Sequence, residues 1–256
     1  ARKNPFVKSL LLFDWFHTKR FESKATRRFS RCLLVSEVDA RALKTHCPKA
    51  SLSIIPNGAD INYFKPTGAV THPNTLIFVG NFTYYPNIDG ALYLSKRIFP
   101  RIRRQIPEAS LYLVGASPPR RIQALGREVG VIAKGRVLDI RPYLERASVF
   151  VNPLRLGAGT SLKLIEAMAM GKAAVSTTVG CQGLRVTPGK DILVADDPDQ
   201  FAKNILLLFK DADLRQRIGL AARRLAVELY DWERIGERLG RVLKEIGNGQ
   251  PQASAG

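Results

Sequence analysis

One segment of this 256-residue chain combines residue types that suit the binding of a phosphorylated ligand. It runs from Gly157 to Glu166 and reads Gly-Ala-Gly-Thr-Ser-Leu-Lys-Leu-Ile-Glu. We expect it to join a strand to the start of a helix, where free backbone N–H groups and the helix dipole attract anions. A cation at Lys163 opposes that dipole, and a bound phosphate would account for it. The spacing matches neither a P-loop nor a dinucleotide-binding fingerprint, so ATP hydrolysis and NAD chemistry are not supported.

Glu166 follows Lys163 by three residues and falls on a similar face of the expected helix. A carboxylate placed behind a phosphate site can accept hydrogen bonds from two ribose hydroxyls. The same pair could instead form an ordinary ion pair on a capped helix. The segment alone leaves both interpretations open.

Two other loops follow expected strands. In the first, Gly80 would let backbone approach a ligand closely, and Asn87 is expected to cap the next helix. The second, residues 179–184, is rich in glycine and should lie beside the segment that begins at Gly157. Its Cys181 is interpreted as a small loop residue and not as a nucleophile, because every histidine lies far away in the sequence.

The elements that would position these loops alternate between strand and helix from residue 75 onward. Strands are expected at 76–79, 110–114, 131–134, 148–151, 173–176 and 192–194. Helices are expected at 87–104, 119–128, 140–146, 161–170, 198–208, 212–229 and 232–246. This alternation is typical of parallel βαβ units and predicts an α/β fold with an open, doubly wound, Rossmann-like parallel sheet. Ligands bind such sheets beyond the carboxyl ends of the strands, where the three loops fall.

The first 74 residues have a less regular pattern. A helix is expected at 6–30, strands at 32–36 and 52–55, a helix at 37–46, and a loop with a domain boundary over 57–74. The first helix carries an apolar stripe among basic residues, formed by Phe6, Leu10, Phe13, Phe16 and Phe21. The stripe could lie in a membrane interface, but amphipathicity alone favours packing on the rest of the protein.

The charge is strongly positive and localised. The formal net charge is +18, and residues 1–50 and 96–146 each hold 12 basic and 4 acidic residues. Such an excess suggests an anionic partner, namely nucleic acid, an anionic membrane face or a phosphorylated substrate. A basic surface that is merely solvated would give the same charge pattern. No nucleic-acid-binding motif is present, so no nucleic acid is expected. The three cysteines lack metal-type spacing and fit a reduced compartment, and no apolar run is long enough to span a membrane.

Residues 153–177 resemble the donor-binding signature of family 4 glycosyltransferases, which are retaining, nucleotide-sugar-dependent enzymes of the GT-B fold. Further segments agree in order: 54–60 with Tyr63 and Phe64, 78–81, 193–198 and 230–232. The resemblance is strongest to bacterial sugar transferases of exopolysaccharide systems and covers about residues 32–245. It implies a hexosyltransferase that needs no metal or cofactor and uses a nucleotide-diphosphate sugar as donor substrate.

The resemblance also implies roles for individual residues. Glu166 would hold the nucleotide ribose, and Gly80 with Asn81 would form the opposing phosphate loop. Backbone N–H groups that bind the donor diphosphate would come from Gly159, Thr160, Ser161 and Leu162. Contacts to the base would come from Gly135, Arg136 and Val137.

Two departures from the family pattern affect the expected site. Ala158 stands where the family has a Glu near the donor sugar. Residues 84–87 replace the basic pair that many members place after the first strand of this domain, and Lys163 is a candidate to supply the positive charge instead.

The resemblance divides the chain into four parts. These are a remnant of an N-terminal acceptor domain with the interdomain connector (1–69), the donor-binding domain (70–229), a C-terminal crossing helix (230–247) and a disordered tail (248–256). Catalytic residues are expected in the largely missing N-terminal domain, so this chain would be the donor-binding part and inactive alone.

The implied reaction is transfer of a sugar to a polysaccharide or lipid-linked acceptor. It would take place in the cytoplasm or at the inner face of the plasma membrane, whose anionic surface the basic stretches would attract. Three alternatives come from other classes: a nucleotide-sugar-binding module without activity, a basic nucleic-acid-binding protein, and a GT-B isomerase or phosphorylase, against which the family-4-like motif argues.

Overall fold

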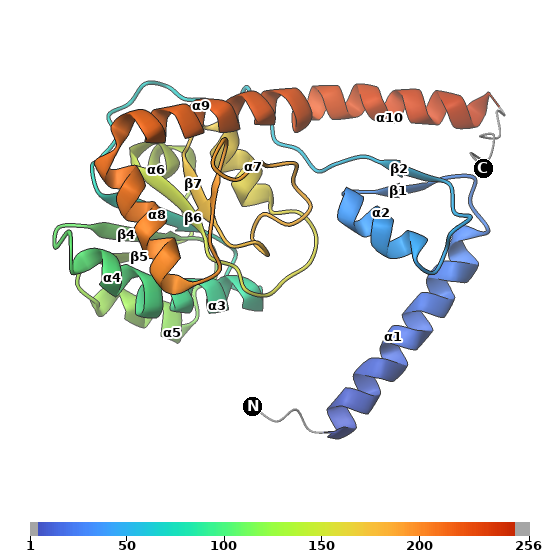
Figure 1. Ribbon diagram of the computed structural model, residues 1–256, viewed down its shortest axis with the longest axis horizontal. Coiled ribbons are helices and arrows are strands. Elements are labelled where there is room, and N and C mark those ends of the chain that lie inside the picture. Colours follow the sequence, from blue (N-terminus) through green and yellow to red (C-terminus); the bar gives the residue numbers. More distant parts are fainter. Residues whose placement is uncertain (1–4, 249–256) are drawn as a thin grey trace. The chain divides into compact units, whose positions relative to one another are not determined.

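The computed structural model describes residues 5–248, without the side chains of residues 5–8 and 11. It divides into two compact units (Figure 1). Unit 1 comprises the chain up to Pro56 and from Gly236 on, and unit 2 comprises Asn57–Ile235. The expected disordered tail lies outside the described residues from residue 249 on.

Unit 2 is built on one sheet of parallel strands. The strands are β3 (Thr75–Val79), β4 (Ser110–Val114), β5 (Val131–Gly135), β6 (Val149–Asn152), β7 (Ala174–Ser176) and β8 (Leu193–Val194). They lie in the order β5-β4-β3-β6-β7-β8, so the chain builds outward from β3 on one side and then returns to build on its other side (Figure 1). The α/β fold with a doubly wound parallel sheet is therefore confirmed.

Successive side chains of each strand enter two hydrophobic clusters, one on each face of the sheet. Leu76 and Phe78 of β3 are buried in one cluster, and Ile77 between them is buried in the other. The first face is covered by α3 (Tyr85–Tyr93), α4 (Phe99–Arg103), α5 (Arg120–Gln123) and α8 (Pro198–Lys210). The second face is covered by α6 (Arg141–Arg146), α7 (Leu162–Ala169) and α9 (Ala212–Leu229). Because both faces of the sheet are buried, the sequences of these strands are continuous runs of apolar residues.

The helix expected at 87–104 differs from the prediction in two ways. It begins two residues earlier, at Tyr85, because Pro86 suits the first turn of a helix; Asn87 therefore lies inside that turn and does not cap it. A π-helical turn, Leu94–Ile98, separates α3 from α4. Pro100 has no N–H to continue the α-helical ladder, which accounts for the interruption. The helix expected at 119–128 is likewise short, and α5 passes into a 3₁₀ turn at Ala124–Arg127.

Unit 1 contains a two-stranded parallel sheet of β1 (Cys32–Leu34) and β2 (Leu52–Ile54). Its helices are α1 (Pro5–Thr26) and α2 (Glu37–Lys44), and α10 (Trp232–Gly247) begins in unit 2 and ends in unit 1. α1 is linked to the chain after α2 by a 2.6 Å contact between Glu22 Oε2 and His46 Nε2. No helix in the described part of the chain is long and apolar enough to cross a membrane.

The first helix ends four residues earlier than expected, because the chain turns at residues 27–30 to enter β1. Its apolar stripe was expected to pack on the rest of the protein. Leu10, Phe13, Phe16 and Phe21 each expose more than half of their surface, so this packing is not made within unit 1. The side chain of Phe6 lies outside the described residues.

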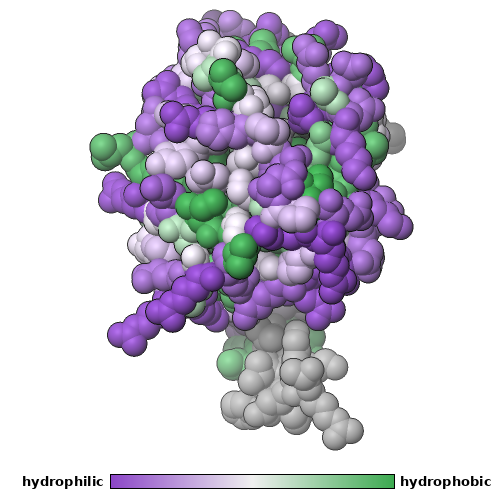
Figure 2. Space-filling model, turned by 90° about the vertical axis from the view of Figure 1, so that its left-hand side faces the viewer, coloured by the Kyte–Doolittle hydropathy of each residue, from purple (hydrophilic) through white to green (hydrophobic). Residues whose placement is uncertain are grey.

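The connector that follows β2 is fixed to unit 2 by hydrogen bonds. The N–H of Ala59 donates to the carbonyl of Tyr230 over 2.8 Å. The buried carboxylate of Glu145 accepts hydrogen bonds from the N–H and the hydroxyl of Thr67, at 2.6 and 2.8 Å. These bonds make the connector part of unit 2. Elsewhere on this unit, the side seen in Figure 2 is mainly hydrophilic, with hydrophobic residues in small separate groups.

The ends of β3 and β4 approach each other closely at two glycines. The N–H of Gly80 donates to the carbonyl of Val114 over 3.0 Å, and a Cβ on Gly115 would lie only 1.7 Å from the Gly80 oxygen. No side chain fits between the two strands at this point, so Gly115 is required by the close backbone approach.

We predict that Gly115→Ala destabilises the protein by about 2–4 kcal/mol, because the added methyl group must push the two strands apart. The control is Gly126→Ala, whose Cβ would make only ordinary contacts, the nearest at 3.5 Å; its effect should stay below about 1 kcal/mol. Urea unfolding followed by circular dichroism measures both. Equal stability of the two variants would contradict the close-approach argument.

Candidate functional site

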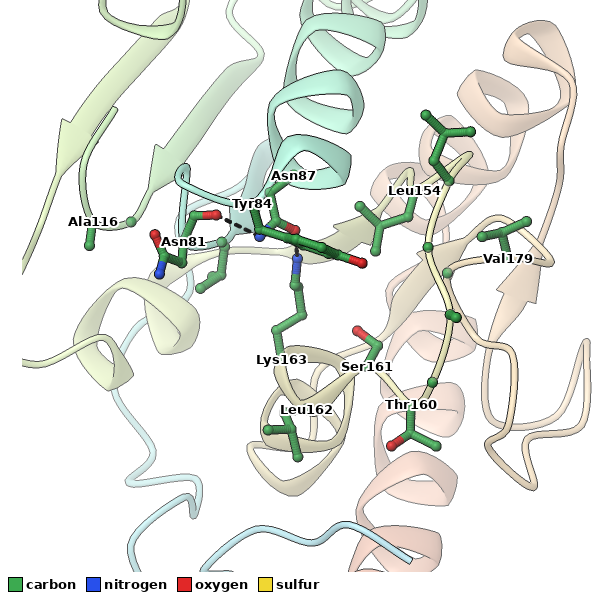
Figure 3. A pocket seen from close by; sticks show the side chains of 18 residues that line it. Asn81, Tyr84, Asn87, Ala116, Leu154, Thr160, Ser161, Leu162, Lys163 and Val179 are labelled. Atoms are coloured by element: carbon green, nitrogen blue, oxygen red, sulfur yellow. Dashed lines mark hydrogen bonds between the residues drawn. The ribbon is translucent and has the colours of Figure 1, made fainter. Parts of the chain in front are cut away.

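Unit 2 contains a cavity of about 450 Å³ at the carboxyl edge of its sheet (Figure 3). Its walls come from the loops that follow β3, β4, β6 and β7 and from the first turn of α7. This is the point where the strand order reverses, between β3 and β6. Open parallel sheets bind ligands there, because loops on the two sides leave in opposite directions.

Bare backbone forms part of the cavity wall. Gly157 and Gly159 line it with positive φ angles of 135° and 80°. A Cβ on Gly159 would meet nothing within 4 Å, so backbone conformation and not lack of space makes glycine suitable there. The loop can therefore adopt the left-handed turn that leads into α7.

The start of α7 presents free hydrogen-bond donors. Ser161 occupies the cap position, but its side chain makes no capping hydrogen bond, and the first turn holds no acidic residue. Within the described residues, the N–H groups of Leu162 and Lys163 have no partner. Two free donors at the positive end of a helix dipole form a binding place for an anion.

Lys163 adds a cation at this place. Its ammonium group donates to Oδ1 of Asn87 and lies 4.8 Å from the ring centre of Phe78 (Figure 3). Burial lowers the pKa of Lys163 to about 8, while the nearby charge of Glu166 acts in the opposite direction. Among the described residues that line the cavity, Lys163 is the one with a charged side chain. The cavity therefore offers a single positive charge that no carboxylate on its wall neutralises.

Glu166 lies one turn further along α7 and does not line the cavity. Its carboxylate is half-buried, and burial raises its pKa, with Lys163 acting in the opposite direction. Within the described residues it makes no hydrogen bond and no ion pair with Lys163, although the two attract each other electrostatically. The ion-pair interpretation of this spacing is thus wrong, and the carboxylate is left with free acceptor capacity.

The structure brings most of the expected donor-site residues together. Those that line the cavity are Gly80, Asn81, Gly159, Thr160, Ser161, Leu162 and Lys163. Those that do not line it are Glu166, Gly135, Arg136 and Val137. Gly135 ends β5 and accepts a hydrogen bond from the N–H of Gly115 at 2.9 Å, Arg136 is exposed, and Val137 packs on the second hydrophobic cluster.

Other lining residues were not identified from the sequence. They include Tyr84, Asn87, Leu154 and Leu156, whereas Val179 belongs to the loop 179–184 that was expected beside the loop that leads into α7. Tyr84 and Asn87 belong to a loop that the pattern did single out, but only as turn and cap residues. Leu154 and Leu156 lie in the segment 153–177 that carries the resemblance but were given no role, because only the packing of strand ends places them at the cavity.

The loop that leads into α7 is held in place by two side-chain hydrogen bonds that reach it from elsewhere in unit 2. Nδ2 of Asn57 donates to Oγ1 of Thr160 over 2.7 Å, and Nδ2 of Asn152 donates to Oγ of Ser161 over 3.1 Å. In the described part of the chain, no cluster of three His, Cys, Asp or Glu side chains is suited to hold a metal ion.

Comparison with known proteins identifies the family. The family model described as "Glycosyl transferases group 1" matches residues 73–211, more than half of the chain. A 44.6 kDa uncharacterized protein in the cps region of Klebsiella pneumoniae is 23% identical over 90% of this chain and 60% of its own length. Phosphatidyl-myo-inositol mannosyltransferase of Mycobacterium tuberculosis is 25% identical over 75% of this chain and 53% of its own length.

Solved structures agree on the fold. HepE from Anabaena, in complex with UDP and glucose, superposes with a TM-score of 0.70 at 18% identity, over 88% of this chain and 66% of HepE. The expected GT-B-type, Rossmann-like fold is thereby confirmed. The chain spans only about half to 60% of the length of the curated relatives that it matches. On the match of the family model, this chain belongs to the group 1 glycosyl transferases.

Proposed function

We propose that this chain is the donor-binding part of a retaining family 4 glycosyltransferase that uses a nucleotide-diphosphate sugar. One observation carries the proposal: a cavity at the switch point of the sheet joins two free N–H groups of α7 with the ammonium of Lys163, the one charged side chain among the described lining residues. A diphosphate is the part of such a donor that needs hydrogen-bond donors and positive charge.

The same groups suit the chemistry of transfer. When the bond between the sugar and the diphosphate breaks, negative charge grows on the leaving nucleoside diphosphate. Fixed N–H donors and an ammonium group aimed at those oxygens stabilise this charge without reorganising. A bound diphosphate would in turn favour the charged form of Lys163, whose pKa of about 8 in the free cavity is set by burial.

The remaining parts of the donor have candidate partners. Glu166, with its free acceptor capacity, would bind the two ribose hydroxyls, and residues 135–137 would contact the base. Ala158 lines the cavity where a carboxylate of the family pattern would approach the donor sugar. The likenesses to a mannosyltransferase and to a structure that contains UDP and glucose support a hexosyl donor.

The acceptor is proposed to be a growing polysaccharide or a lipid-linked saccharide at the inner face of the plasma membrane. The relative from a cps region supports a role in the synthesis of exopolysaccharide. The localised basic residues would attract anionic lipid headgroups, at about 1 kcal/mol for each well-placed Lys or Arg.

A second candidate is a nucleotide-sugar-binding module without activity. It is favoured by the walls of the cavity, because the described lining residues include no Asp, Glu or His that could act as an acid or base. An assay in the presence of the N-terminal domain of a full-length relative distinguishes the two candidates: transfer of sugar supports the transferase, and binding without transfer supports the module.

We predict that the chain binds one nucleoside diphosphate among UDP, GDP and ADP and that Lys163→Met weakens this binding about 10- to 100-fold, since a charge-assisted hydrogen bond is lost. Calorimetric titration at pH 7 measures it. Binding of the corresponding nucleoside, which has no phosphate, should hardly change. Lys203→Met removes an exposed lysine of α8 and serves as the control. Unchanged affinity of Lys163→Met would refute the role of Lys163 in binding phosphate.

A second prediction concerns the ribose. In the native protein, removing both ribose hydroxyls from the preferred nucleotide, as in its 2′,3′-dideoxy analogue, should weaken binding about tenfold. In Glu166→Gln the analogue and the ribonucleotide should bind almost equally, because a carboxylate is no longer there to accept both hydrogen bonds. Glu228→Gln changes an exposed glutamate of α9 and should leave the tenfold ratio intact. A ratio that persists in Glu166→Gln would place the ribose elsewhere.

A further inference from the structure

Asn87 joins the two sides of the cavity from a buried position. It lies on α3, is only 5% exposed and lines the cavity. Its Nδ2 donates to the carbonyl of Asn81 over 2.8 Å, and its Oδ1 accepts a hydrogen bond from the Lys163 ammonium group (Figure 3). One amide therefore contacts both the loop after β3 and the first turn of α7.

The neighbouring backbone leaves room for this amide. A Cβ on Gly80 would lie 2.8 Å from Cγ of Asn87, which is closer than side chains pack. Glycine at position 80 thus allows the amide to lie against the end of β3. Since Asn87 does not cap its helix, its side chain has no capping role that would explain these contacts.

The chemistry of an amide differs from that of a carboxylate at this position. A carboxylate would pair with the ammonium group and cancel its charge. An amide oxygen accepts one hydrogen bond and leaves the positive charge, together with the other N–H groups of the ammonium, available to an anionic ligand.

We infer that Asn87 is a positioning residue for the donor diphosphate: its amide holds the Lys163 ammonium group at the cavity and ties it to the Asn81 loop. This inference rests on the proposed function and explains how the cation is kept both oriented and charged. The two segments that would contact the diphosphate are thereby fixed relative to each other before the ligand binds.

The surroundings of Lys163 make its charge sensitive to residue 87. Glu166 faces it from α7, the Phe78 ring from β3, and the amide of Asn87 from α3, while Tyr84 also lines the cavity. Glu166 is the one titratable group among them that shifts the pKa of Lys163, and it raises it against the effect of burial. A carboxylate in place of the amide would raise this pKa further.

The first test uses the protein without ligand. Lysines are reductively methylated with ¹³C-formaldehyde, and the Lys163 resonance is assigned by its loss in Lys163→Arg. In the native protein the resonance should titrate near pH 8, and Asn87→Asp should move its pKa upward. The control is Asn204→Asp, which changes a half-buried asparagine of α8 that bonds Gln200 and lies outside the cavity. An identical Lys163 titration in the native protein and in Asn87→Asp would overturn the inference.

The second test measures binding of UDP, GDP and ADP by calorimetry between pH 7 and 9.5. Native affinity should fall as the pH rises above about 8, because Lys163 loses its proton. At pH 7, Asn87→Asp and Asn87→Ala should each bind about tenfold more weakly or worse. Asn87→Asp should also shift the fall in affinity to higher pH, an effect that a loss of structure alone would not produce.

The outcomes separate the two proposals. If the native protein binds a nucleoside diphosphate and both Asn87 variants bind it equally well with the same pH profile, the positioning role is wrong and the donor site stands. If the native chain binds none of UDP, GDP and ADP, the proposed function is wrong, and this inference, which rests on it, is wrong as well. Circular dichroism is the control that tests whether each variant is folded.

Discussion

The candidate site depends on the reversal of strand order between β3 and β6. Because all the strands of this sheet are parallel, their carboxyl ends meet at one edge, and the loops after β3 and β6 leave that edge in opposite directions. The space between them becomes the cavity. Gly80 and Gly115, whose backbones approach each other closely, line this cavity, and the glycines before α7 let its loop adopt a left-handed turn.

Electrostatic interactions make the cavity suited to a negatively charged ligand. Burial disfavours the charged form of Lys163, whereas two free N–H groups and the dipole of α7 favour a negative ligand beside it. A neutral amide partner holds the ammonium group without cancelling its charge. The net charge of +18 belongs to the chain as a whole, whereas the described lining of the cavity holds one charged side chain, that of Lys163.

The sequence predicted the sheet and the position of the site because both leave local patterns. Strands buried on both faces are short apolar runs, and the turn from β6 to α7 needs glycines and helix-starting residues. Contacts between distant segments leave no such pattern. The amide of Asn87 was mistaken for a helix cap, Lys163 and Glu166 were open to interpretation as an ion pair, and Leu154 and Leu156 were given no role. Their roles follow from how the strand ends pack, which local spacing does not encode.

The most direct test of this account is a crystal structure of the chain with the nucleoside diphosphate that it binds, grown below pH 8. The account predicts that diphosphate oxygens lie within hydrogen-bond distance of the N–H groups of Leu162 and Lys163 and of the Lys163 ammonium group, with the nucleotide in the cavity between β3 and β6. A nucleotide bound elsewhere on unit 2, or in the cavity with its phosphates directed away from α7, would contradict it.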